Sequence, residues 1–457
     1  MKDASDLIAQ YQSEGIKRVK FAVCDIDGVL RGKYISLEKF AAIADGTSGF
    51  CDCVLGWDVD DQLYDNAAFT GWHTAYPDAL VRLDLTTERR LLDEGNIPFF
   101  LGDFVTRDQQ ELHSICPRSR LKAVLSRAQL AGFSAKLAFE YEFFVFDETP
   151  HSIREKNYRN LVPLSPGNFG YSVLRTNTHA DLFNELMDYC SAHDFALECL
   201  HCETGPGVWE GAIAVDDALA AVDKAIMFKT FVKSFFQRKG LVATFMAKWS
   251  LDYPGQSGHC HQSLQHLDNG ESAFFDANAP HSMSEIQQFY VAGQQKYLRQ
   301  LLAITSPTIN SYTRLVKGAW APTAATWGVE NRTTALRVIP GSAKSQRVEF
   351  RVGSADANPY LVAAATLGAG LLGIEERLEL TAPVVGDAYA IQDQLPPDWQ
   401  FPTNLRDANR ALAKSEAAKN LFGEPFVEHF VASRDWEVRQ YEKQVTDWQL
   451  QRYFEII

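Results

Sequence analysis

The chain has 457 residues, 46% hydrophobic and 22% charged, a globular composition that excludes disordered, collagen-like and low-complexity classes. Asp and Glu (58) outnumber Lys and Arg (44), for a net charge of −14. This acidity, without a Lys/Arg-rich block, argues against a surface for nucleic acid or anionic membranes. At roughly 100–200 residues per domain, the length predicts two or three domains, or one large domain with a smaller partner.

The N-terminal segment, the apolar runs and the cysteines indicate the compartment. The first residues are polar, without the apolar core of a secretory signal, and the longest apolar run, near 361–373, is too short to span a bilayer. Eight cysteines occur without paired C-x-x-C sets, so free buried thiols are favoured over a zinc site at Cys51 and Cys53 or at Cys199 and Cys202. We therefore expect a cytoplasmic protein.

The predicted elements begin with short N-terminal strands. Residues 18–25 alternate apolar and polar side chains, Asp27-Gly28 is typical of a tight turn, and residues 29–36 return as a second strand, which predicts a β-hairpin. Near Cys116 the pattern changes to an amphipathic helix over 119–130, closed by Gly132. We place the domain boundary there, with an N-terminal domain at 1–112 and a larger domain at 113–457.

Beyond this boundary strands and helices alternate, which predicts the α+β class. The expected strands cover 134–146, 197–203, 242–247, 334–338 and 347–352. The expected helices cover 180–193, 216–239 with Asp216 as N-cap, and 283–304. A stretch containing Pro and Gly, 382–402, precedes charged terminal helices.

Acidic residues recur on the strands of the larger domain. Glu140 and Glu142 are two residues apart on an otherwise apolar strand, so both side chains project from one face. Adjacent carboxylates there repel one another and lose solvation unless a cation neutralises them. Each acid alone is typical of a solvated strand face, but this pair predicts a metal site together with Glu203, Glu210 and Glu349.

Two histidines suit the same site, because His259 and His261 are again two residues apart. A ligand set rich in oxygen, with at most one imidazole, fits Mg²⁺ or Mn²⁺ better than structural zinc. The sequence therefore predicts one of these two ions as the cofactor metal.

A set of arginines follows the acids: Arg314, Arg332, Arg337, Arg347 and Arg351. Guanidinium groups stay charged and bind carboxylates and phosphates through two parallel hydrogen bonds. A surface salt-bridge network would also use arginines, but carboxylates and arginines in one chain predict metal-assisted phosphoryl transfer. The G-x-x-x-x-G-K-[ST] motif does not occur, so a P-loop would not hold the nucleotide.

Eight motifs, in order, resemble the glutamine synthetase superfamily over nearly the whole chain. They are Glu140-x-Glu142; Glu203 with Gly-Pro-Gly and Glu210; Ala243-Thr-Phe-Met-Ala-Lys248; Ser257-Gly-His259-x-His261-Gln-Ser263; Asn310-Ser-Tyr-x-Arg314; Asn331-Arg332; Arg347-x-Glu349-x-Arg351; and Asn358-Pro-Tyr360. The resemblance implies an N-terminal β-grasp domain and a large catalytic domain with a curved antiparallel sheet. It also implies a homo-oligomeric ring, a dodecamer being the expected form, in which a neighbour's N-terminal domain completes each site.

The resemblance implies two metal sites and an ATP site. One Mg²⁺ or Mn²⁺ near the amino-acid substrate would be held by Glu142, Glu203 and Glu210, and a second at the ATP phosphates by Glu140, His259 and Glu349. The implied contacts to the nucleotide and its phosphates are His261, Ser263, Arg337 and Arg347. The implied contacts to the carboxylates of glutamate are Arg314 and Arg351, and Arg332 would stabilise the transferring phosphoryl group.

Two departures from the family pattern concern the nitrogen donor. Ammonia-using members carry a glutamate that takes a proton from ammonium, and Trp320 stands at that position, in Lys317-Gly-Ala-Trp-Ala-Pro322. An indole cannot accept this proton but offers an apolar or cation–π surface to a larger amine. Val208 stands where many members have Gln, which also makes the site less polar. The alternative is that Trp320 only packs, or that the loop is aligned one residue off.

These changes resemble the subgroup that glutamylates polyamines and monoamines. We therefore predict an ATP-dependent ligase that forms a γ-glutamyl amide from glutamate and an organic amine through a γ-glutamyl phosphate. One alternative is a true glutamine synthetase that uses ammonia. A second is a non-catalytic relative that keeps the fold, against which the presence of all the expected ligands and arginines argues.

Overall fold

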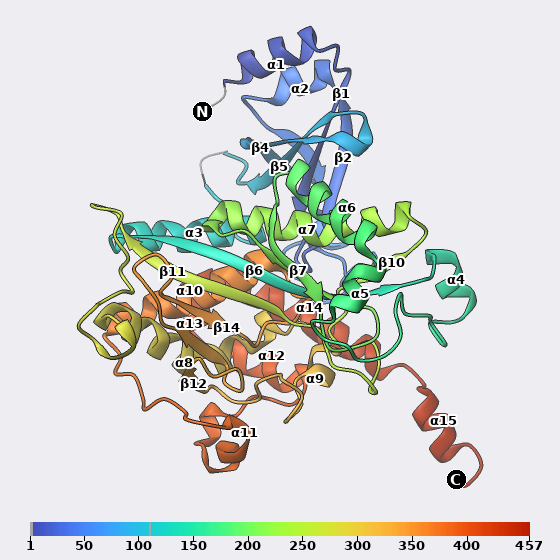
Figure 1. Cartoon of the computed structure of the whole chain (residues 1–457). Helices are drawn as coiled ribbons and strands as arrows, with labels where there is room; N and C mark the ends of the chain where they lie inside the picture. Colours follow the sequence, from blue (N-terminus) through green and yellow to red (C-terminus); the bar gives the residue numbers. More distant parts are fainter. Residues whose placement is uncertain (1–2, 109–110) are drawn as a thin grey trace.

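The computed structural model describes residues 3–108 and 111–457, which form two β-sheets surrounded by helices (Figure 1). The five-stranded N-terminal sheet has the order β2-β1-β5-β4-β3. Its strands are β1 (Arg18–Cys24), β2 (Leu30–Ser36), β3 (Ser48–Cys51), β4 (Asp78–Leu91) and β5 (Ile97–Val105). Helices α1 (Ala4–Ser13) and α2 (Leu37–Ile43) pack on this sheet, because Leu7, Tyr11 and Phe40 share a buried core with Phe21 and Phe100.

The predicted hairpin is confirmed. β1 and β2 pair antiparallel from Arg18 opposite Ser36 to Cys24 opposite Leu30. The expectation of only short strands in this region is wrong for β4, whose 14 residues include a register shift between Asp84 and Arg89. The shift interrupts the regular alternation by which a strand is predicted from sequence.

The large sheet has the order β12-β13-β14-β11-β6-β8-β7, and β9 and β10 also pair with β6. All of its paired strands are antiparallel except β12 and β13. The strands are β6 (Phe133–Phe146), β7 (Leu197–Cys202), β8 (Val208–Ile213), β9 (Asp216–Asp217), β10 (Val242–Thr244), β11 (Gly258–His266), β12 (Trp327–Val329), β13 (Leu336–Ile339) and β14 (Arg347–Phe350). The α+β class with a curved large sheet is thereby confirmed. The boundary between 112 and 113 stays a prediction.

Helices cover one face of the large sheet. α3 (Pro117–Leu130) and α7 (Ala218–Arg238) pack against β6, and α10 (Pro359–Glu376) lies between α3 and α8 (Glu285–Thr305) (Figure 1). α10 is apolar on all sides as far as Gly373 because neighbouring elements bury it, which explains the long apolar run in the sequence. In the described ranges, 3–108 and 111–457, no helix is both long and apolar enough to cross a membrane.

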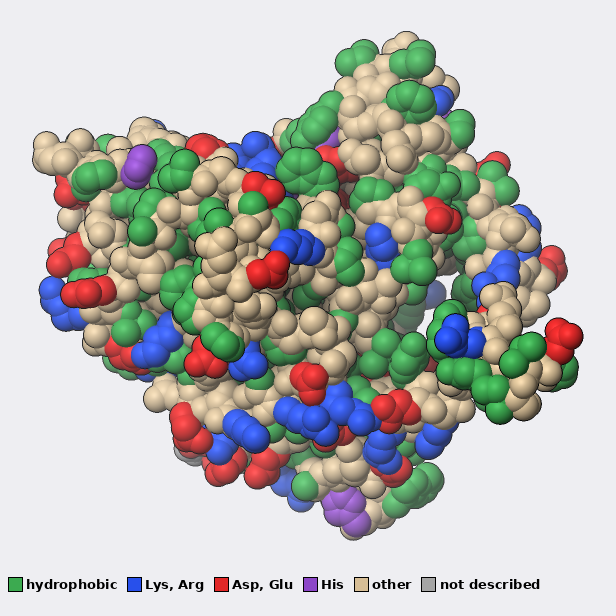
Figure 2. Space-filling model, turned by 90° about the horizontal axis from the view of Figure 1, so that it is seen from below, with side chains coloured by type: hydrophobic (Ala, Val, Ile, Leu, Met, Phe, Trp, Pro, Cys, Tyr) green, Lys and Arg blue, Asp and Glu red, His purple; other side chains and the backbone are tan. Residues whose placement is uncertain are grey.

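The remaining helices lie in connections or follow α10. They are α4 (Pro150–Glu155), α5 (Val173–Thr178), α6 (Ala180–Ala192), α9 (Ser311–Arg314), α11 (Ala388–Ile391), α12 (Leu405–Ala413), α13 (Glu416–Phe422), α14 (Glu424–Glu442) and α15 (Asp447–Tyr453). Short 3₁₀ turns are η1 (Asp52–Leu55), η2 (Leu92–Glu94), η3 (Pro280–Ser282), η4 (Gln392–Gln394) and η5 (Pro397–Trp399). The face shown in Figure 2 intermixes acidic, basic and apolar side chains, so the net charge is not gathered in one patch there.

Two predicted elements begin or end elsewhere. Asp216 is not the N-cap of the long helix: it pairs with β6 as part of β9 and forms an ion pair with Lys224 at 2.8 Å, and Asp217 precedes α7. The strand predicted over 242–247 ends at Thr244, where pairing with β6 stops. In both places strand pairing decided the boundary, and pairing partners cannot be read from a local pattern.

A buried ion-pair network joins the N-terminal sheet to the helices. Arg118, fully buried on α3, donates to Asp84 at 2.9 Å and to Asp103 at 2.7 Å, both on the N-terminal sheet. It also donates to both carboxylate oxygens of Asp223 on α7, at 2.9 and 2.8 Å. One guanidinium thus holds three carboxylates from three elements outside its own helix.

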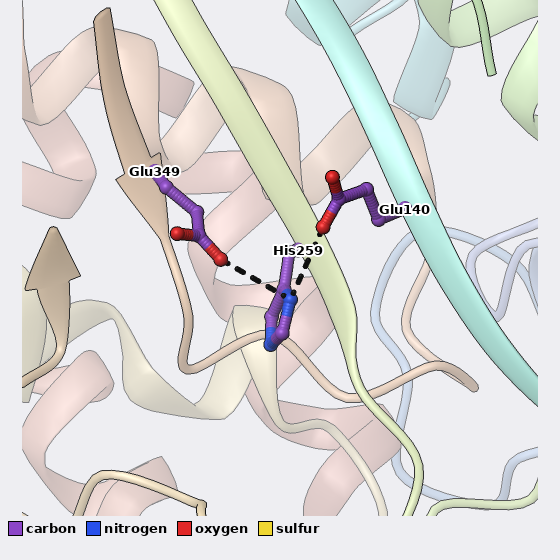
Figure 3. Close-up of side chains that lie close together, drawn as sticks. All are labelled: Glu140, His259 and Glu349. Atoms are coloured by element: carbon purple, nitrogen blue, oxygen red, sulfur yellow. Dashed lines mark ion pairs between the residues drawn. The ribbon is translucent and has the colours of Figure 1, made fainter. Parts of the chain in front are cut away.

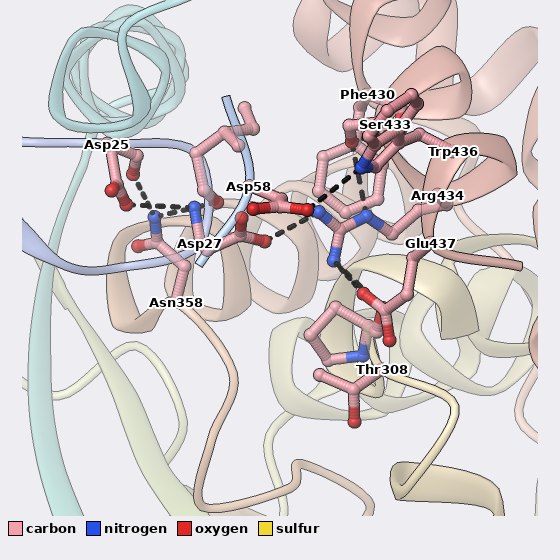
Figure 4. Close-up of polar contacts among 12 residues, drawn as sticks. Asp25, Asp27, Asp58, Thr308, Asn358, Phe430, Ser433, Arg434, Trp436 and Glu437 are labelled. Carbon is pink, nitrogen blue, oxygen red and sulfur yellow. Dashed lines mark hydrogen bonds and ion pairs between the residues drawn. The ribbon is translucent and has the colours of Figure 1, made fainter. Parts of the chain in front are cut away.

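The turn of the β1–β2 hairpin lies against the start of α10 and against α14 (Figure 4). Asn358 donates from Nδ2 to the carbonyl oxygen of Asp25 at 3.0 Å, and Arg434 donates to Asp27 at 2.5 Å. Gly28 has φ of +83°, and a Cβ there would lie 3.0 Å from the Asn358 Cα atom, so only glycine fits this contact. Arg434 also donates to the carbonyl of Pro307 at 2.9 Å, which ties the turn to the segment before α9.

Two buried histidines, His113 and His429, both pack against the Phe69 ring and should make this part of the protein sensitive to acid. Burial lowers the pKa of His429 to about 4, and burial with the nearby Arg120 lowers that of His113 to about 4. Both pKa values lie below the ordinary value of 6.5, so the unfolded chain takes up protons between pH 6.5 and 4 while the folded chain does not. Their contribution to stability is present above pH 6.5 and is lost as the pH falls through this range.

We expect the free energy of unfolding to fall by up to about 1.4 kcal/mol per pH unit for each of these histidines. Urea unfolding at pH 7 and pH 5 measures this dependence. The informative variant is His429→Gln, because a glutamine Nε2 can still donate to the Leu55 carbonyl, which lies 2.6 Å from the histidine Nε2, but does not titrate. The free energy of unfolding of this variant should depend less on pH, by the contribution of one titrating histidine. An unchanged pH dependence would contradict the lowered pKa of His429.

Candidate active site

Two adjoining cavities lie on the large sheet, and Glu140 lines both. The larger has a volume of about 710 Å³ and the smaller about 250 Å³. The larger is lined by the predicted residues Glu140, Glu142, Glu203, Val208, Glu210, His259, Arg314, Trp320, Arg332, Arg337, Glu349 and Arg351. The smaller is lined by His261, Ser263 and Arg347 as well as Glu140.

Strand register explains why these side chains converge. Glu140 is directly opposite His259 across β6 and β11, and Glu142 is opposite Glu210 across β6 and β8. Farther along the sheet Glu349 is opposite Arg337, across β14 and β13. Opposite residues in antiparallel strands point to the same face, so the sheet gathers acids and arginines into one site.

The first candidate metal cluster consists of Glu140, His259 and Glu349, from three adjacent strands (Figure 3). The His259 Nδ1 atom lies 3.3 Å from Glu349 Oε1 and 3.6 Å from Glu140 Oε2. Burial would raise the pKa of Glu349, but His259 and Arg351 lower it to about 2, so this carboxylate is ionised at neutral pH. Two ionised carboxylates and an imidazole converge on one point, which suits a divalent cation.

The second candidate cluster consists of His201, Glu203 and Glu210. His201 was not predicted; it is opposite Glu210 across β7 and β8, and its Nε2 lies 3.8 Å from Glu210 Oε1. Glu142 lies in the same cavity, but one of its oxygens accepts a 2.6 Å hydrogen bond from the backbone N–H of Ser257. His201 precedes Glu203 by two residues on the chain, the same spacing that identified His259 and His261, so a signal for it was present.

The electrostatics of the second cluster call for a cation. Burial, with the charges of Glu142 and Glu140, raises the pKa of Glu210 to about 9, so this carboxyl holds a proton at neutral pH when no cation is bound. Carboxylate oxygens with one imidazole per cluster are a donor set that Mg²⁺ or Mn²⁺ accepts. The residues in both clusters therefore fit divalent metal ions.

The arginines divide between the two cavities. Arg314 is buried and donates to the carbonyl oxygen of Val352 at 2.9 Å; burial lowers its pKa to about 10, so it remains a cation at neutral pH. Arg351 pairs with Glu349, and Arg337 pairs with Glu349 at 3.0 Å. Arg332 is exposed on the wall of the larger cavity.

The four predicted nucleotide contacts are not all in one cavity. Arg347 lies in the smaller cavity, where its Nε atom is 3.2 Å from His261 Nδ1, and Ser263 lines the same cavity. Arg337 lines the larger cavity instead. It extends from β13 beside the first metal cluster, a position that suits contact with a phosphate rather than with the rest of a nucleotide.

Aromatic and apolar side chains form the rest of the larger cavity. Trp320 is 65% exposed, with φ of +57°, and Val208 packs with Phe144 and Phe146 while also reaching the cavity wall. Tyr171 was not predicted: its ring stacks on His201, with centroids 4.4 Å apart. It lies in an irregular loop before α5, where no periodicity could have indicated its position.

Known proteins resemble this chain over most of its length. Residues 114–453 match the family described as glutamine synthetase, catalytic domain. The chain is 44% identical to type-1 glutamine synthetase 2 of Dictyostelium discoideum, over 100% of this chain and 87% of the relative. It is 35% identical to a glutamate–isopropylamine ligase of a Pseudomonas species, over 98% of this chain and 96% of the relative. A solved structure described as a GmaS complex with ADP has a TM-score of 0.86 and 27% identity, and covers 99% of this chain and 100% of that one.

Proposed function

Because this chain belongs to the glutamine synthetase family, whose members are ligases that use ATP and divalent metal ions, we propose that it joins the γ-carboxylate of glutamate to an organic amine. The observation that carries the proposal is Trp320, which lines the cavity that also holds both candidate metal clusters and four arginines. The relative named glutamate–isopropylamine ligase supports the same type of nitrogen donor.

In this proposal the clusters Glu140/His259/Glu349 and His201/Glu203/Glu210, with Glu142, would hold two divalent ions, Mg²⁺ or Mn²⁺. When bound, such ions neutralise phosphate oxygens and orient the nucleotide. The smaller cavity, with His261, Ser263 and Arg347, would hold part of the ATP molecule.

The chain's own residues would bind and orient the reactants. Arg314 and Arg351 would hold the carboxylates of glutamate, and Arg332 would face the phosphoryl group as its charge develops. The γ-carboxylate oxygen attacks the γ-phosphorus of ATP, the bond to ADP breaks, and γ-glutamyl phosphate forms. The neutral amine then attacks its carbonyl carbon, phosphate leaves, and the departing phosphate takes the proton that the nitrogen loses. Trp320 would cover the amine and keep water from the acyl phosphate.

The acids of the larger cavity favour a monoamine over a polyamine. Among the described residues that line it, the carboxylates are Glu140, Glu142, Glu203, Glu210 and Glu349, all of which are predicted metal ligands. Once these are engaged by cations, this lining offers no free acid to a second ammonium group. An apolar substituent would instead meet Trp320 and Val208.

The proposal includes assembly into a homo-oligomeric ring, a dodecamer being the expected form. Helix α15 projects away from the body in Figure 1, and Trp448, Phe454 and Ile457 are exposed on and after it. Exposed apolar side chains on a projecting helix favour its packing against another copy of the chain, because this contact removes them from water. Light scattering on the purified protein measures the number of subunits.

Phosphate release tests the proposed activity. The enzyme is supplied with glutamate, ATP and Mg²⁺, and ammonia, putrescine, ethanolamine, isopropylamine and an aromatic monoamine are compared as nitrogen donors. We expect a monoamine to give the highest kcat/KM. Ammonia as the best donor would identify a true glutamine synthetase. No phosphate release with any donor, together with no metal-dependent nucleotide binding, would identify a non-catalytic relative.

Replacing the indole should affect the amine alone. We expect Trp320→Ala to raise KM for the organic amine about tenfold, because the variant loses the apolar and cation–π surface, and to leave KM for ATP unchanged. The matched control is Trp320→Phe, which keeps an aromatic face and should keep most of the affinity. Equal losses for amine and ATP would mean that Trp320 has only a structural role.

A further inference from the structure

The Pro- and Gly-containing stretch after α10 lies along two loops of the larger cavity. We call residues 384–393 the strap; it includes α11 and the start of η4. The first loop, residues 317–323, carries Trp320, and the second, residues 331–333, carries Arg332. Both of these side chains are exposed, and neither loop is part of a strand or of a helix.

The first half of the strap is bonded to the Arg332 loop. Asn331 donates from Nδ2 to the carbonyl oxygen of Val384 at 3.1 Å and to that of Gly386 at 2.8 Å. The backbone N–H of Ala388 donates to Thr333 Oγ1 at 2.9 Å. A Cβ on Gly328 would lie 2.9 Å from the Val384 carbonyl oxygen, so the strap lies close against the strand that precedes this loop.

The second half of the strap is bonded to the Trp320 loop. The Tyr389 hydroxyl donates to the carbonyl oxygen of Ala321, the residue after Trp320, at 3.3 Å. Thr323 Oγ1 donates to Gln392 Oε1 at 2.5 Å, and Lys317 Nζ lies 3.2 Å from Asp393 Oδ2. Contacts therefore occur at both ends and in the middle of this loop.

The backbone of the Trp320 loop requires such support. Trp320 has φ of +57°, a left-handed backbone conformation that is energetically unfavourable for a residue with a Cβ atom. A conformation of this kind persists only where the surroundings hold it. The Tyr389 hydroxyl is the strap group bonded beside Trp320, because it donates to the carbonyl oxygen of the next residue.

We propose that the strap holds the Trp320 loop and the Arg332 loop at a set separation, and that Tyr389 is the positioning residue that determines selectivity for the nitrogen donor. The same ten residues bind both loops, so the indole that would cover the amine and the guanidinium that would face the phosphoryl group are placed by one element. The identity of the nitrogen donor rests on the proposed function, whereas the inference that the strap holds the two loops in place does not.

Hydrogen–deuterium exchange of the full-length protein tests directly whether the strap holds the Trp320 loop in place. Tyr389→Ala should increase deuterium uptake in peptides covering 315–323, and Tyr389→Phe, which keeps the ring, should increase it less. The matched control is Val385→Ala on the same strap, because Val385 is 92% exposed. Uptake in 315–323 equal to that of the wild type in both Tyr389 variants would overturn the proposal.

Steady-state kinetics with the preferred nitrogen donor and with the other donors of the panel test the selectivity, which is the ratio of their kcat/KM values and should fall in Tyr389→Ala. With the nitrogen donor that the wild type prefers, we expect Tyr389→Ala to raise KM for that donor about tenfold and to leave KM for ATP unchanged, because the smaller cavity makes no contact with the strap residues that bond the loop. The KM of Tyr389→Phe for the donor should lie between the values of the wild type and of Tyr389→Ala. An equal rise in KM for ATP, or no rise for the donor, would overturn the role of Tyr389. A wild type that prefers ammonia would refute the proposed amine substrate while leaving both readouts valid.

Discussion

Glu349→Gln should lower kcat about 100-fold and weaken Mn²⁺ binding, while the variant keeps its secondary structure. Glu349 is 1% exposed and belongs to the cluster with Glu140 and His259. Its pKa of about 2 means that it offers a full negative charge at neutral pH, which an amide does not. A cation that loses one of three protein ligands loses several kcal/mol of the charge stabilisation on which phosphoryl transfer depends.

The matched control for this prediction is Glu330→Gln. Glu330 also pairs with Arg337, but it is half exposed and does not line the larger cavity. The control should therefore keep most of its activity and its metal affinity. Mn²⁺ titration, phosphate release and circular dichroism are measured on both variants.

Glu140→Gln provides a second variant in the same cluster, because Glu140 is less buried than Glu349 and its replacement disturbs fewer ion pairs. It should reproduce the loss of metal binding. Near-normal Mn²⁺ affinity in both cluster variants would remove this cluster from the proposed mechanism.

Arg118→Met should lower the free energy of unfolding by about 3–5 kcal/mol, the cost of removing one partner from a buried ion-pair network. The substitution leaves Asp84, Asp103 and Asp223 close together without the cation that separates their charges. Lys122 pairs with Asp84 and Asp103 but not with Asp223, so it compensates only in part. The N-terminal sheet would lose the buried Arg118 connection to α3 and α7.

The control for this second prediction lies on the same helix. Arg127→Met removes a partly exposed arginine that pairs with Glu375, and pairs of this type contribute at most about 1 kcal/mol. Urea unfolding of both variants gives the comparison. Equal losses of unfolding free energy in the two variants would show that the substitution in helix α3, rather than the loss of the buried network, causes the destabilisation.

Much of the fold and most of the candidate site could be predicted from short-range patterns. The spacing of Glu140 and Glu142, and of His259 and His261, predicts two pairs that face one side of a sheet, because side chains alternate along any strand. The β1–β2 hairpin was predicted for the same reason, from alternation on both sides of Asp27-Gly28. These inferences need only neighbours in the chain.

Other features depend on which strands and loops come together. His201 joins Glu203 and Glu210 because β7 pairs with β8, and Tyr171 reaches His201 from an irregular loop. Arg337 lies in the larger cavity, apart from His261, Ser263 and Arg347, because β13 is at the far side of β14. Pairing between distant segments is set by burial and backbone hydrogen bonding over the whole molecule, and no local spacing reports it.

The sequence by itself determined the family, the α+β class and the identity of the acids, histidines and arginines, and it predicts that Trp320 stands where the family pattern has an acid. Periodicity and motif order are properties of the covalent chain, so they can be read from the sequence alone. Only the tertiary structure decided that His201 joins Glu203 and Glu210, that two cavities share Glu140, and that residues 384–393 connect the loops of Trp320 and Arg332. Those outcomes follow from strand register and loop packing, which arise when the chain buries its apolar surface.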